Sequence, residues 1–195
     1  MAVRLLAFSG STRAGSLNQT LIDLAVAEAR ARGAEVTEIR LKDFNLPLYD
    51  GDLEASAFPQ GARDLKALFR SHHGFLIASP EYNGGVSGVL KNAIDWVSRP
   101  TDGENLVALS GFRGKVAGLM AASISPFGGL RGISHLRQIL STIQVTVATE
   151  QVLVPFAQSA FDEDRRLKEA LPAQLLGGLA ARVIDLAERL EPPIS

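Results

Sequence analysis

Short runs of apolar residues alternate along this chain with stretches in which apolar residues recur every three or four positions. Short apolar runs are typical of buried strands, and the wider spacing is typical of helices with one buried face. We therefore predict strands at residues 3–8, 35–41, 74–79, 115–122 and 145–154, and helices at residues 18–32, 62–73, 88–97, 132–143 and 175–190. The strand at 35–41 alternates apolar and charged residues, so we expect it to be more exposed than the others.

This alternation predicts one α/β domain over residues 1–195, with a three-layer, doubly wound, flavodoxin-like fold. Five strands favour a parallel sheet of order 2-1-3-4-5 over the six-stranded Rossmann arrangement. Ligands of such sheets bind at the carboxyl ends of the strands, near the point where the strand order reverses. The loops that follow Phe8, Ser79 and Ala122 should therefore converge on one site.

Residues 9–18 join the first strand to the first helix and contain two glycines, four hydroxyl side chains, Arg13 and Asn18. Backbone N–H groups at a helix N-terminus bind phosphate, and hydroxyls and an arginine add further donors. This loop is therefore a candidate phosphate site, in which Asn18 either caps the helix or donates to the phosphate. An ordinary polar turn with helix capping is the alternative interpretation.

Two known phosphate-binding motifs do not fit this loop. Gly10 and Gly15 have nearly the spacing of a P-loop, which also requires a lysine and a magnesium-binding hydroxyl. Ser16 stands in the place of the lysine and Leu17 in the place of the hydroxyl. The dinucleotide fingerprint G-x-G-x-x-G is absent as well. An NTPase and a standard dinucleotide-binding domain are therefore disfavoured.

A second loop, residues 79–85, follows the third strand and has the sequence Ser-Pro-Glu-Tyr-Asn-Gly-Gly. Pro80 fixes the backbone as the strand ends, and the glycines allow the main chain to lie close to a planar ligand. The residues between them can present amides and side chains to the polar edge of a flavin ring. Taken alone the loop would be interpreted as a turn with a surface tyrosine, but a phosphate loop at the same sheet edge favours a binding site.

Together the two loops and the segment 90–96, Leu-Lys-Asn-Ala-Ile-Asp-Trp, resemble the NADPH-dependent FMN reductase family, which includes quinone, chromate and azo-dye reductases. The resemblance in element order covers nearly the whole chain and implies an FMN-binding homodimer or homotetramer. It assigns the FMN phosphate to Ser11, Arg13, Ser16 and Asn18, and the isoalloxazine ring to Pro80, Glu81, Tyr82 and Asn83. The predicted cofactor-binding set also includes Leu17, Gly84 and Ser123.

A third loop, residues 123–131, has Ser125 and Pro126 where similar family members have more glycine. Ser123 is its best candidate for a flavin contact. A tight turn into the next helix is an equally good interpretation of this loop, because glycine and proline also serve turns.

Other polar residues are expected to have structural roles. His72 and His73 close the second helix and are expected to cap its C-terminus through the helix dipole, and no metal site is predicted. Lys91 and Asp95 are spaced for an i,i+4 ion pair, and together with Trp96 they are expected to face a partner subunit.

The composition of the chain limits the kinds of partner and the cellular compartment that we expect. The chain has 20 basic and 21 acidic residues and a net charge of −1, so we expect no nucleic acid or anionic membrane partner. It has no cysteine, which excludes disulfides and thiolate chemistry and fits a cytoplasmic protein. The apolar run at 3–8 is too short for a signal peptide, and no segment approaches the roughly 20 apolar residues of a membrane span.

These observations predict an oxidoreductase in which NADPH or NADH delivers a hydride to bound FMN and a small molecule takes the electrons. No side chain is predicted to be catalytic, because the flavin carries the chemistry. Quinones, azo compounds, metal oxyanions and free flavin remain open as acceptors, and the long loops at 44–60 and 99–113 are expected to line their space. Arg13 could serve the FMN phosphate or the 2′-phosphate of NADPH.

Two other functions remain open at this point. One is a non-enzymatic flavodoxin-type electron carrier, although such carriers are strongly acidic and their first loop has a Thr-Gly-x-Thr pattern. The other is a nucleotide-binding domain without redox activity, which the near match to a P-loop motivates.

Overall fold

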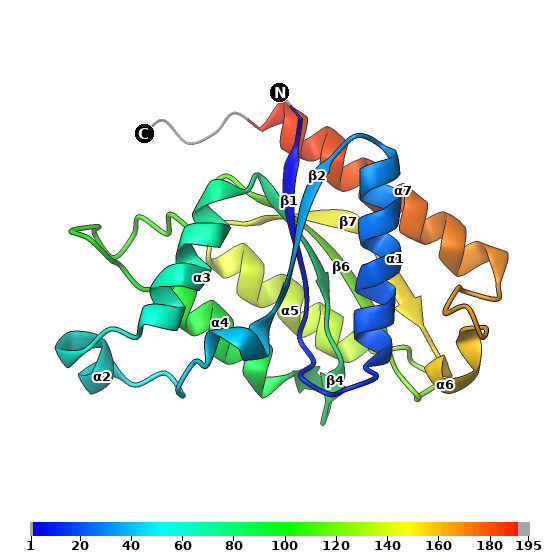
Figure 1. The fold of residues 1–195 in the computed structure, drawn as a ribbon, viewed down its shortest axis with the longest axis horizontal. Helices are drawn as coiled ribbons and strands as arrows, with labels where there is room; N and C mark the ends of the chain where they lie inside the picture. The colour runs from blue at the N-terminus through cyan, green and yellow to red at the C-terminus, as the bar shows by residue number, and fades with distance from the viewer. Residues whose placement is uncertain (1, 191–195) are drawn as a thin grey trace.

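The computed structural model describes residues 2–190, and five parallel strands form its central sheet (Figure 1). They are β1 (Arg4–Ser9), β2 (Glu35–Arg40), β3 (Gly74–Ala78), β6 (Val116–Ala122) and β7 (Thr146–Val154), in the order β2-β1-β3-β6-β7. This confirms the predicted flavodoxin-like order. The central strands β3 and β6 are buried throughout, as expected for apolar runs covered on both faces. The edge strand β2 has no buried residue, which confirms its predicted exposure.

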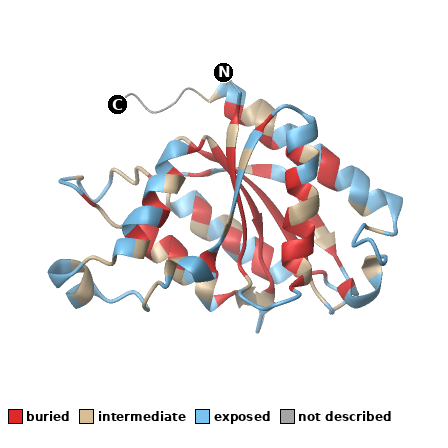
Figure 2. Ribbon diagram, viewed as in Figure 1, coloured by how far each residue is buried: buried red, intermediate tan, exposed pale blue. Residues whose placement is uncertain are grey.

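Helices cover both faces of the sheet. They are α1 (Leu17–Ala31), α2 (Gly51–Ser56), α3 (Gln60–Ser71), α4 (Gly88–Ser98), α5 (Leu130–Thr142), α6 (Ala157–Ala160) and α7 (Ala170–Arg189), and a 3-10 turn η1 spans Leu41–Phe44. One apolar core lies between the sheet and α1 and α7, and a second lies between the sheet and α3, α4 and α5. Figure 2 shows the buried strands between these two layers, whose outer faces are exposed.

Close packing of α7 on the sheet depends on Gly118 in β6. A Cβ atom at this position would lie 2.6 Å from Cγ2 of Val183 and about 3.1 Å from the side chain of Leu179. A larger residue would therefore push α7 away from the strand, since interiors are close-packed.

The structure corrects several predicted elements. The predicted loop at 44–60 contains α2, whose N-terminus is capped by the Asp50 side chain. Helix α6 was not predicted, and α7 begins five residues before the predicted position 175. The predicted domain also includes Met1 and residues 191–195, which lie outside the described residues.

Helix α7 also corrects the prediction that no segment is long and apolar enough to span a membrane. It has 20 residues with a mean hydropathy of 1.3 in its most apolar window, so it is a candidate span by length and composition alone. In this fold Leu176, Leu179 and Val183 are buried in the core formed with the sheet and α1. A helix packed in the core of a protein has the same length and composition as such a span.

Candidate functional site

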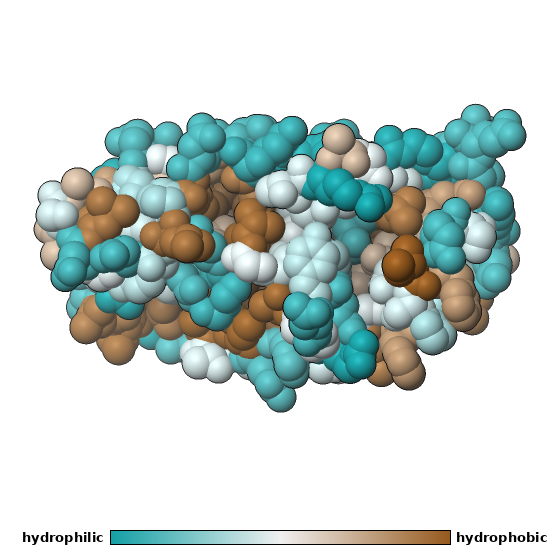
Figure 3. Space-filling view, turned by 90° about the horizontal axis from the view of Figure 1, so that it is seen from below, coloured by the Kyte–Doolittle hydropathy of each residue, from teal (hydrophilic) through white to brown (hydrophobic). Residues whose placement is uncertain are grey.

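The carboxyl ends of β1, β3 and β6 meet at one edge of the sheet, and a cavity of ≈ 320 Å³ opens there. It is lined by Ser11, Arg13, Ser16, Leu17, Asn18, Pro80, Glu81, Tyr82, Ala122, Ser123 and Ile124. All the predicted cofactor-binding residues except Asn83 and Gly84 therefore line one cavity. Ala122 and Ile124 were missed, because an apolar strand end gives no polar signal. Figure 3 shows this edge of the molecule from below, with apolar side chains gathered on both sides of a paler centre.

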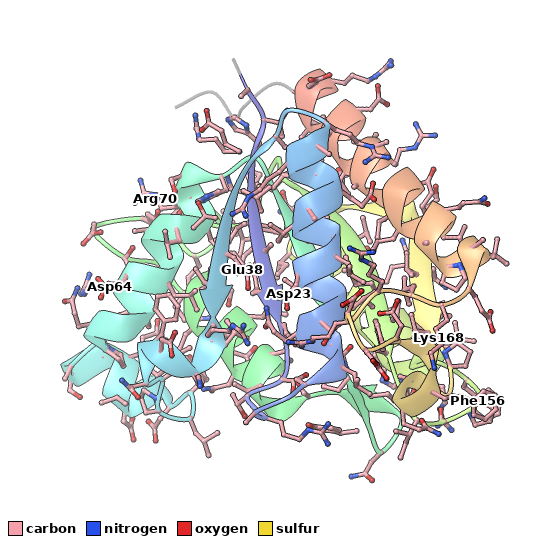
Figure 4. The ribbon with its side chains drawn as sticks, turned by 45° about the vertical axis from the view of Figure 1, so that its right-hand side comes forward. Asp23, Glu38, Asp64, Arg70, Phe156 and Lys168 are labelled. Atoms are coloured by element: carbon pink, nitrogen blue, oxygen red, sulfur yellow. The ribbon has the colours of Figure 1, made fainter. Side chains whose placement is uncertain are left out.

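A second cavity, of ≈ 270 Å³, lies beyond the end of β7. Its lining includes Phe156 and Lys168, which Figure 4 shows close together on the α6 side of the molecule. No predicted site residue lines this cavity. The first cavity is therefore the better candidate, because several polar groups converge on it from three strand ends.

The loop between β1 and α1 is held in shape by its own hydroxyl groups. Ser9 Oγ accepts from the N–H of Ser11 at 3.2 Å, and Ser11 Oγ accepts from the N–H of Arg13 at 3.4 Å. Ser16 is the N-cap of α1, and its Oγ accepts from the N–H of Gln19 at 3.4 Å. The hydroxyls of Ser11 and Ser16 line the cavity and act as acceptors here, so their own hydrogens are left to donate to a ligand.

The start of α1 has the features of an anion site. Its first N–H groups have no acceptor within the helix, and the helix dipole places partial positive charge there. The Arg13 side chain is exposed beside it, and its Nη2 is 3.4 Å from the carbonyl oxygen of Gly15. This arrangement suits a phosphate group.

Asn18 does not cap α1, which corrects one of its two predicted roles, because Ser16 holds the N-cap position. The Asn18 side chain is buried and bridges to the end of β6. Its Nδ2 donates to the carbonyl of Ala122 at 2.8 Å, and its Oδ1 accepts from the N–H of Ala122 at 2.9 Å. Nδ2 has a second hydrogen, so donation to a phosphate stays a prediction.

The loop after β3 is a small hairpin, which was not predicted. Strand β4 (Glu81–Tyr82) pairs antiparallel with β5 (Gly85–Val86). Asn83 and Gly84 at the tip have φ angles of 51° and 78°, as a two-residue type I′ turn requires. The turn explains why this position carries glycine. The tip lies outside the cavity lining, and the predicted flavin contacts of its two residues stay predictions.

Glu81 lines the cavity, but its carboxylate is engaged with α5. It accepts from the backbone N–H groups of Arg131 and Gly132 at 3.0 and 3.2 Å, and from Nε of Arg131 at 2.7 Å. Burial alone would raise the pKa of Glu81, but these hydrogen bonds and the Arg131 charge outweigh it and hold the pKa below its usual value.

The loop after β6 is a tight turn into α5. Gly128 and Gly129 have φ angles of 60° and 89°, and Gly129 occupies the N-cap position of α5. The two glycines therefore serve the turn, in agreement with the structural interpretation of this loop. Ser123 lines the cavity, and its Oγ accepts from the N–H of Ser125 at 3.2 Å.

The segment 90–96 anchors a neighbouring loop of the same chain. Nδ2 of Asn92 and Nε1 of Trp96 both donate to the carbonyl of Pro47 at 2.8 Å, and the N–H of Tyr49 donates to Asn92 at 2.8 Å. Trp96 is fully buried, so the prediction that it faces a partner subunit is wrong. The predicted ion pair between Lys91 and Asp95 is confirmed at 2.7 Å.

The two adjacent histidines have different roles. His72 is the C-cap residue of α3, and its Nδ1 lies 2.7 Å from the carbonyl oxygen of Leu68, which confirms a capping position. Burial lowers the pKa of His72, because it disfavours the charged imidazolium. The cap predicted for His73 is wrong, because its Nδ1 instead accepts from the N–H of Arg4 in β1 at 3.1 Å.

Comparison with known proteins identifies the family of this chain. The model of the family described as NADPH-dependent FMN reductase matches residues 3–159. The chain belongs to the NADPH-dependent FMN reductase family. An NAD(P)H-dependent FMN reductase of Pseudomonas aeruginosa is 36% identical over 176 residues, which cover 89% of each chain. A probable NADPH:quinone oxidoreductase of Oryza sativa subsp. japonica is 33% identical over 186 residues, or 90% of this chain and 86% of the relative.

Solved structures agree with this assignment. FerB, a flavoenzyme NAD(P)H:(acceptor) oxidoreductase from Paracoccus denitrificans, superposes with a TM-score of 0.78 at 25% identity, over 97% of this chain and 99% of its own. Membership of the FMN reductase family makes this protein an oxidoreductase with FMN as cofactor and NAD(P)H as electron donor. It decides against the non-enzymatic electron carrier and against the nucleotide-binding domain without redox activity.

The residues of the cavity fit FMN. At one end, α1 begins beside the hydroxyls of Ser11 and Ser16 and the guanidinium of Arg13, a donor set suited to a phosphate dianion. Glu81 and Tyr82 of the hairpin and Ser123 also line the cavity, and main-chain and hydroxyl groups of this kind suit the edge of a ring. The carboxylate of Glu81 accepts hydrogen bonds from α5, so its negative charge is already paired.

Proposed function

We propose that this FMN reductase transfers electrons from NAD(P)H to quinones, with FMN bound in the cavity at the carboxyl ends of β1, β3 and β6. One observation carries the proposal: an anion-binding helix N-terminus and a hairpin beside β3 line the same cavity of ≈ 320 Å³. A cavity of this size is in the range of cofactor sites. The name of the rice relative, a probable NADPH:quinone oxidoreductase, supports a quinone as the acceptor.

The chain's own residues bind and orient in this proposal. The hydroxyls of Ser11 and Ser16, the N–H groups at the start of α1 and the side chain of Arg13 hold the phosphate. Pro80 to Gly84 and Ser123 lie along the isoalloxazine ring. When bound, FMN supplies the redox chemistry, because its ring can accept a hydride from a nicotinamide and pass electrons on. The protein then needs no acid–base pair beside the ring.

Exposed apolar side chains support a second part of the proposal, that the protein is a homodimer or homotetramer. Leu48 is 82% exposed, and Leu106 and Val107 are 66% and 65% exposed. They lie in the two segments, 44–60 and 99–113, that were predicted to line the acceptor space. Clusters of exposed apolar residues mark interaction sites. Light scattering coupled to gel filtration tests this part, and a monomer at micromolar concentration would contradict it.

The proposed activity is tested with the purified protein. Titration of the apoprotein with FMN, followed by flavin fluorescence, should show saturable binding of one FMN per chain. The loaded protein should then oxidise NADPH or NADH in the presence of a benzoquinone. A parallel panel with an azo dye, chromate and free FMN at equal concentration ranks the acceptors. Absence of FMN binding would contradict the proposed site, and a preference for any other acceptor would contradict the quinone assignment.

A cytoplasmic location also stays a prediction. Fractionation of the source cells, with an antibody against the protein, would decide it.

A further inference from the structure

Helix α5 begins without a capping side chain of its own, because its N-cap residue is Gly129. The N–H groups two and three positions further on, at Arg131 and Gly132, are the ones that a capping serine or aspartate would bind. Glu81 binds both of them from a different element, at 3.0 and 3.2 Å. The side chain of Glu81 is only 5% exposed, so this is a buried cap that reaches α5 from 50 residues earlier in the chain.

The backbone of the hairpin packs directly on the same turn of α5. A Cβ atom at Gly132 would lie 3.1 Å from the carbonyl oxygen of Gly85 and 3.2 Å from Cβ of Glu81. At these distances an alanine would require the hairpin to shift by a few tenths of an ångström. The guanidinium of Arg131 completes the contact through Nε and an ion pair with the same carboxylate.

The helices α1 and α5 both begin at the edge of the sheet that carries the cavity, and their N-termini differ in charge. The start of α1 has hydroxyls and an arginine around it, and it lines the cavity. The start of α5 is already occupied by a carboxylate of the protein. A phosphate group is attracted to the N-terminus of α1, and it has no favourable interaction with the N-terminus of α5.

We propose that Glu81 is a positioning residue: it fastens the hairpin to α5, so that the hairpin residues lining the flavin cavity are in place before FMN binds, and it closes the N-terminus of α5 to the phosphate. This inference rests on the proposed placement of FMN in the cavity. Its physical basis is preorganisation, because a wall that is fixed in advance costs less conformational entropy when the ligand arrives.

The test compares four variants with the wild type: Glu81→Ala, Glu81→Gln, Arg131→Ala and Gly132→Ala. Arg131→Ala leaves both backbone hydrogen bonds to Glu81 and serves as the matched control on the same contact. Glu163→Ala, an exposed glutamate, controls for loss of one negative charge. Two quantities are measured: the Kd for FMN by fluorescence quenching, and hydrogen exchange of the apoprotein over residues 81–86 and 130–133.

The Kd for FMN should rise about tenfold or more in Glu81→Ala, because the N–H groups of Arg131 and Gly132 both lose their acceptor, and less than about threefold in Arg131→Ala. Glu81→Gln should lie between them, since an amide oxygen can still accept. Gly132→Ala should weaken FMN binding although it keeps the carboxylate, because the added Cβ shifts the hairpin by a few tenths of an ångström. Amide exchange of the apoprotein should accelerate in both segments for Glu81→Ala and Gly132→Ala.

Three results would overturn the inference: a Kd within twofold of the wild type in Glu81→Ala, an unchanged affinity in Gly132→Ala, or weaker binding without faster exchange. The last result would mean that Glu81 acts on the ring directly. If Glu81→Ala fails to fold, the FMN affinities and the amide exchange of Glu81→Gln and Gly132→Ala test the inference in its place. Failure of the wild type to bind FMN would instead contradict the proposed function, and the exchange measurement on the apoprotein would still show whether Glu81 fastens the hairpin.

Discussion

The side chain of Asn18 forms hydrogen bonds with both the carbonyl and the N–H of Ala122, although the two residues are 104 positions apart. Its amide donates to the carbonyl and accepts from the N–H at 2.8 and 2.9 Å, as the backbone of a neighbouring strand would. The contact joins the start of α1, where the phosphate is proposed to bind, to the end of β6, where the third loop begins. The relative position of two walls of the cavity therefore depends on one buried side chain.

Replacing Asn18 by alanine should lower the free energy of unfolding by about 3 kcal/mol, because a buried N–H and a buried carbonyl lose their partners. Asn18→Asp should be similarly destabilised, since a carboxylate can accept from the N–H of Ala122 but repels its carbonyl. Urea denaturation followed by circular dichroism measures the change. Gln174→Ala, on the exposed face of α7, is the control. A loss below about 1 kcal/mol in both Asn18 variants would show that water replaces the side chain.

Arg13 should contribute to FMN binding through its charge. The Kd for FMN of Arg13→Ala should rise roughly tenfold to a hundredfold, because hydrogen bonds to charged groups contribute about 1.5–3 kcal/mol. Arg30→Ala, at the other end of α1, is the matched control and should bind FMN as the wild type does. Affinity is measured by fluorescence titration of the apoprotein.

The same variant separates the two predicted roles of Arg13. An unchanged Kd for FMN combined with a higher KM for NADPH and an unchanged KM for NADH would assign the arginine to the 2′-phosphate of NADPH. That outcome would contradict its role in the proposed FMN site.

The layout of the sheet could be predicted because it follows from local patterns. The strands β3 and β6 are uninterrupted apolar runs, and the alternation of elements leaves few arrangements of a parallel sheet. The hairpin after β3 also had a local signal that was missed, since Asn83-Gly84 is the pair most typical of a two-residue turn. Helix α2 also had a local sequence signal, because Asp50 is a typical N-cap residue.

The contacts that organise the cavity could not be predicted in this way. Glu81 and Asn18 bind backbone groups 50 and 104 positions away, and a backbone N–H has no sequence signature. Trp96 illustrates the same limit, since it was expected to face a partner subunit and is instead covered by the segment around Pro47. Residue type therefore predicted which side chains gather at the cavity, while three-dimensional packing decides which of them face the ligand.

The loop at 99–113 should depend on the ion pair between Lys66 and Glu104. The side chain of Lys66 is 3% exposed, and its ammonium also donates to the carbonyl of Arg99. Glu104 additionally accepts from Ser110 and from the N–H of Thr101. Without Lys66 the half-buried Glu104 keeps only Arg70, at 3.9 Å, as a charged partner, so Lys66→Met should lose about 1–3 kcal/mol of stability.

Glu104→Gln should be destabilised less than Lys66→Met, because its amide oxygen still accepts from two of the partners. Both changes are measured by urea denaturation, with Glu163→Gln as an exposed control. A double variant no less stable than Lys66→Met alone would confirm that the two residues act as a pair. Additive losses would contradict the coupling.

Lys115 should make the stability of this protein depend on pH in the alkaline range. Its ammonium is buried and donates to the carbonyls of Arg70 and His72, and burial, together with Arg4 and Arg70, lowers its pKa to about 8. Below pH 8 the folded and the unfolded chain both carry the proton, and folding bears the full cost of burying the charge. Between pH 8 and about 10.5 the unfolded chain binds more protons than the folded chain, so stability from this group rises with pH.

The wild type should gain at most about 3 kcal/mol relative to Lys115→Met over this window. Urea denaturation at several pH values measures the difference, with Lys42→Met as an exposed control. Parallel stability curves for the wild type and Lys115→Met would contradict the prediction.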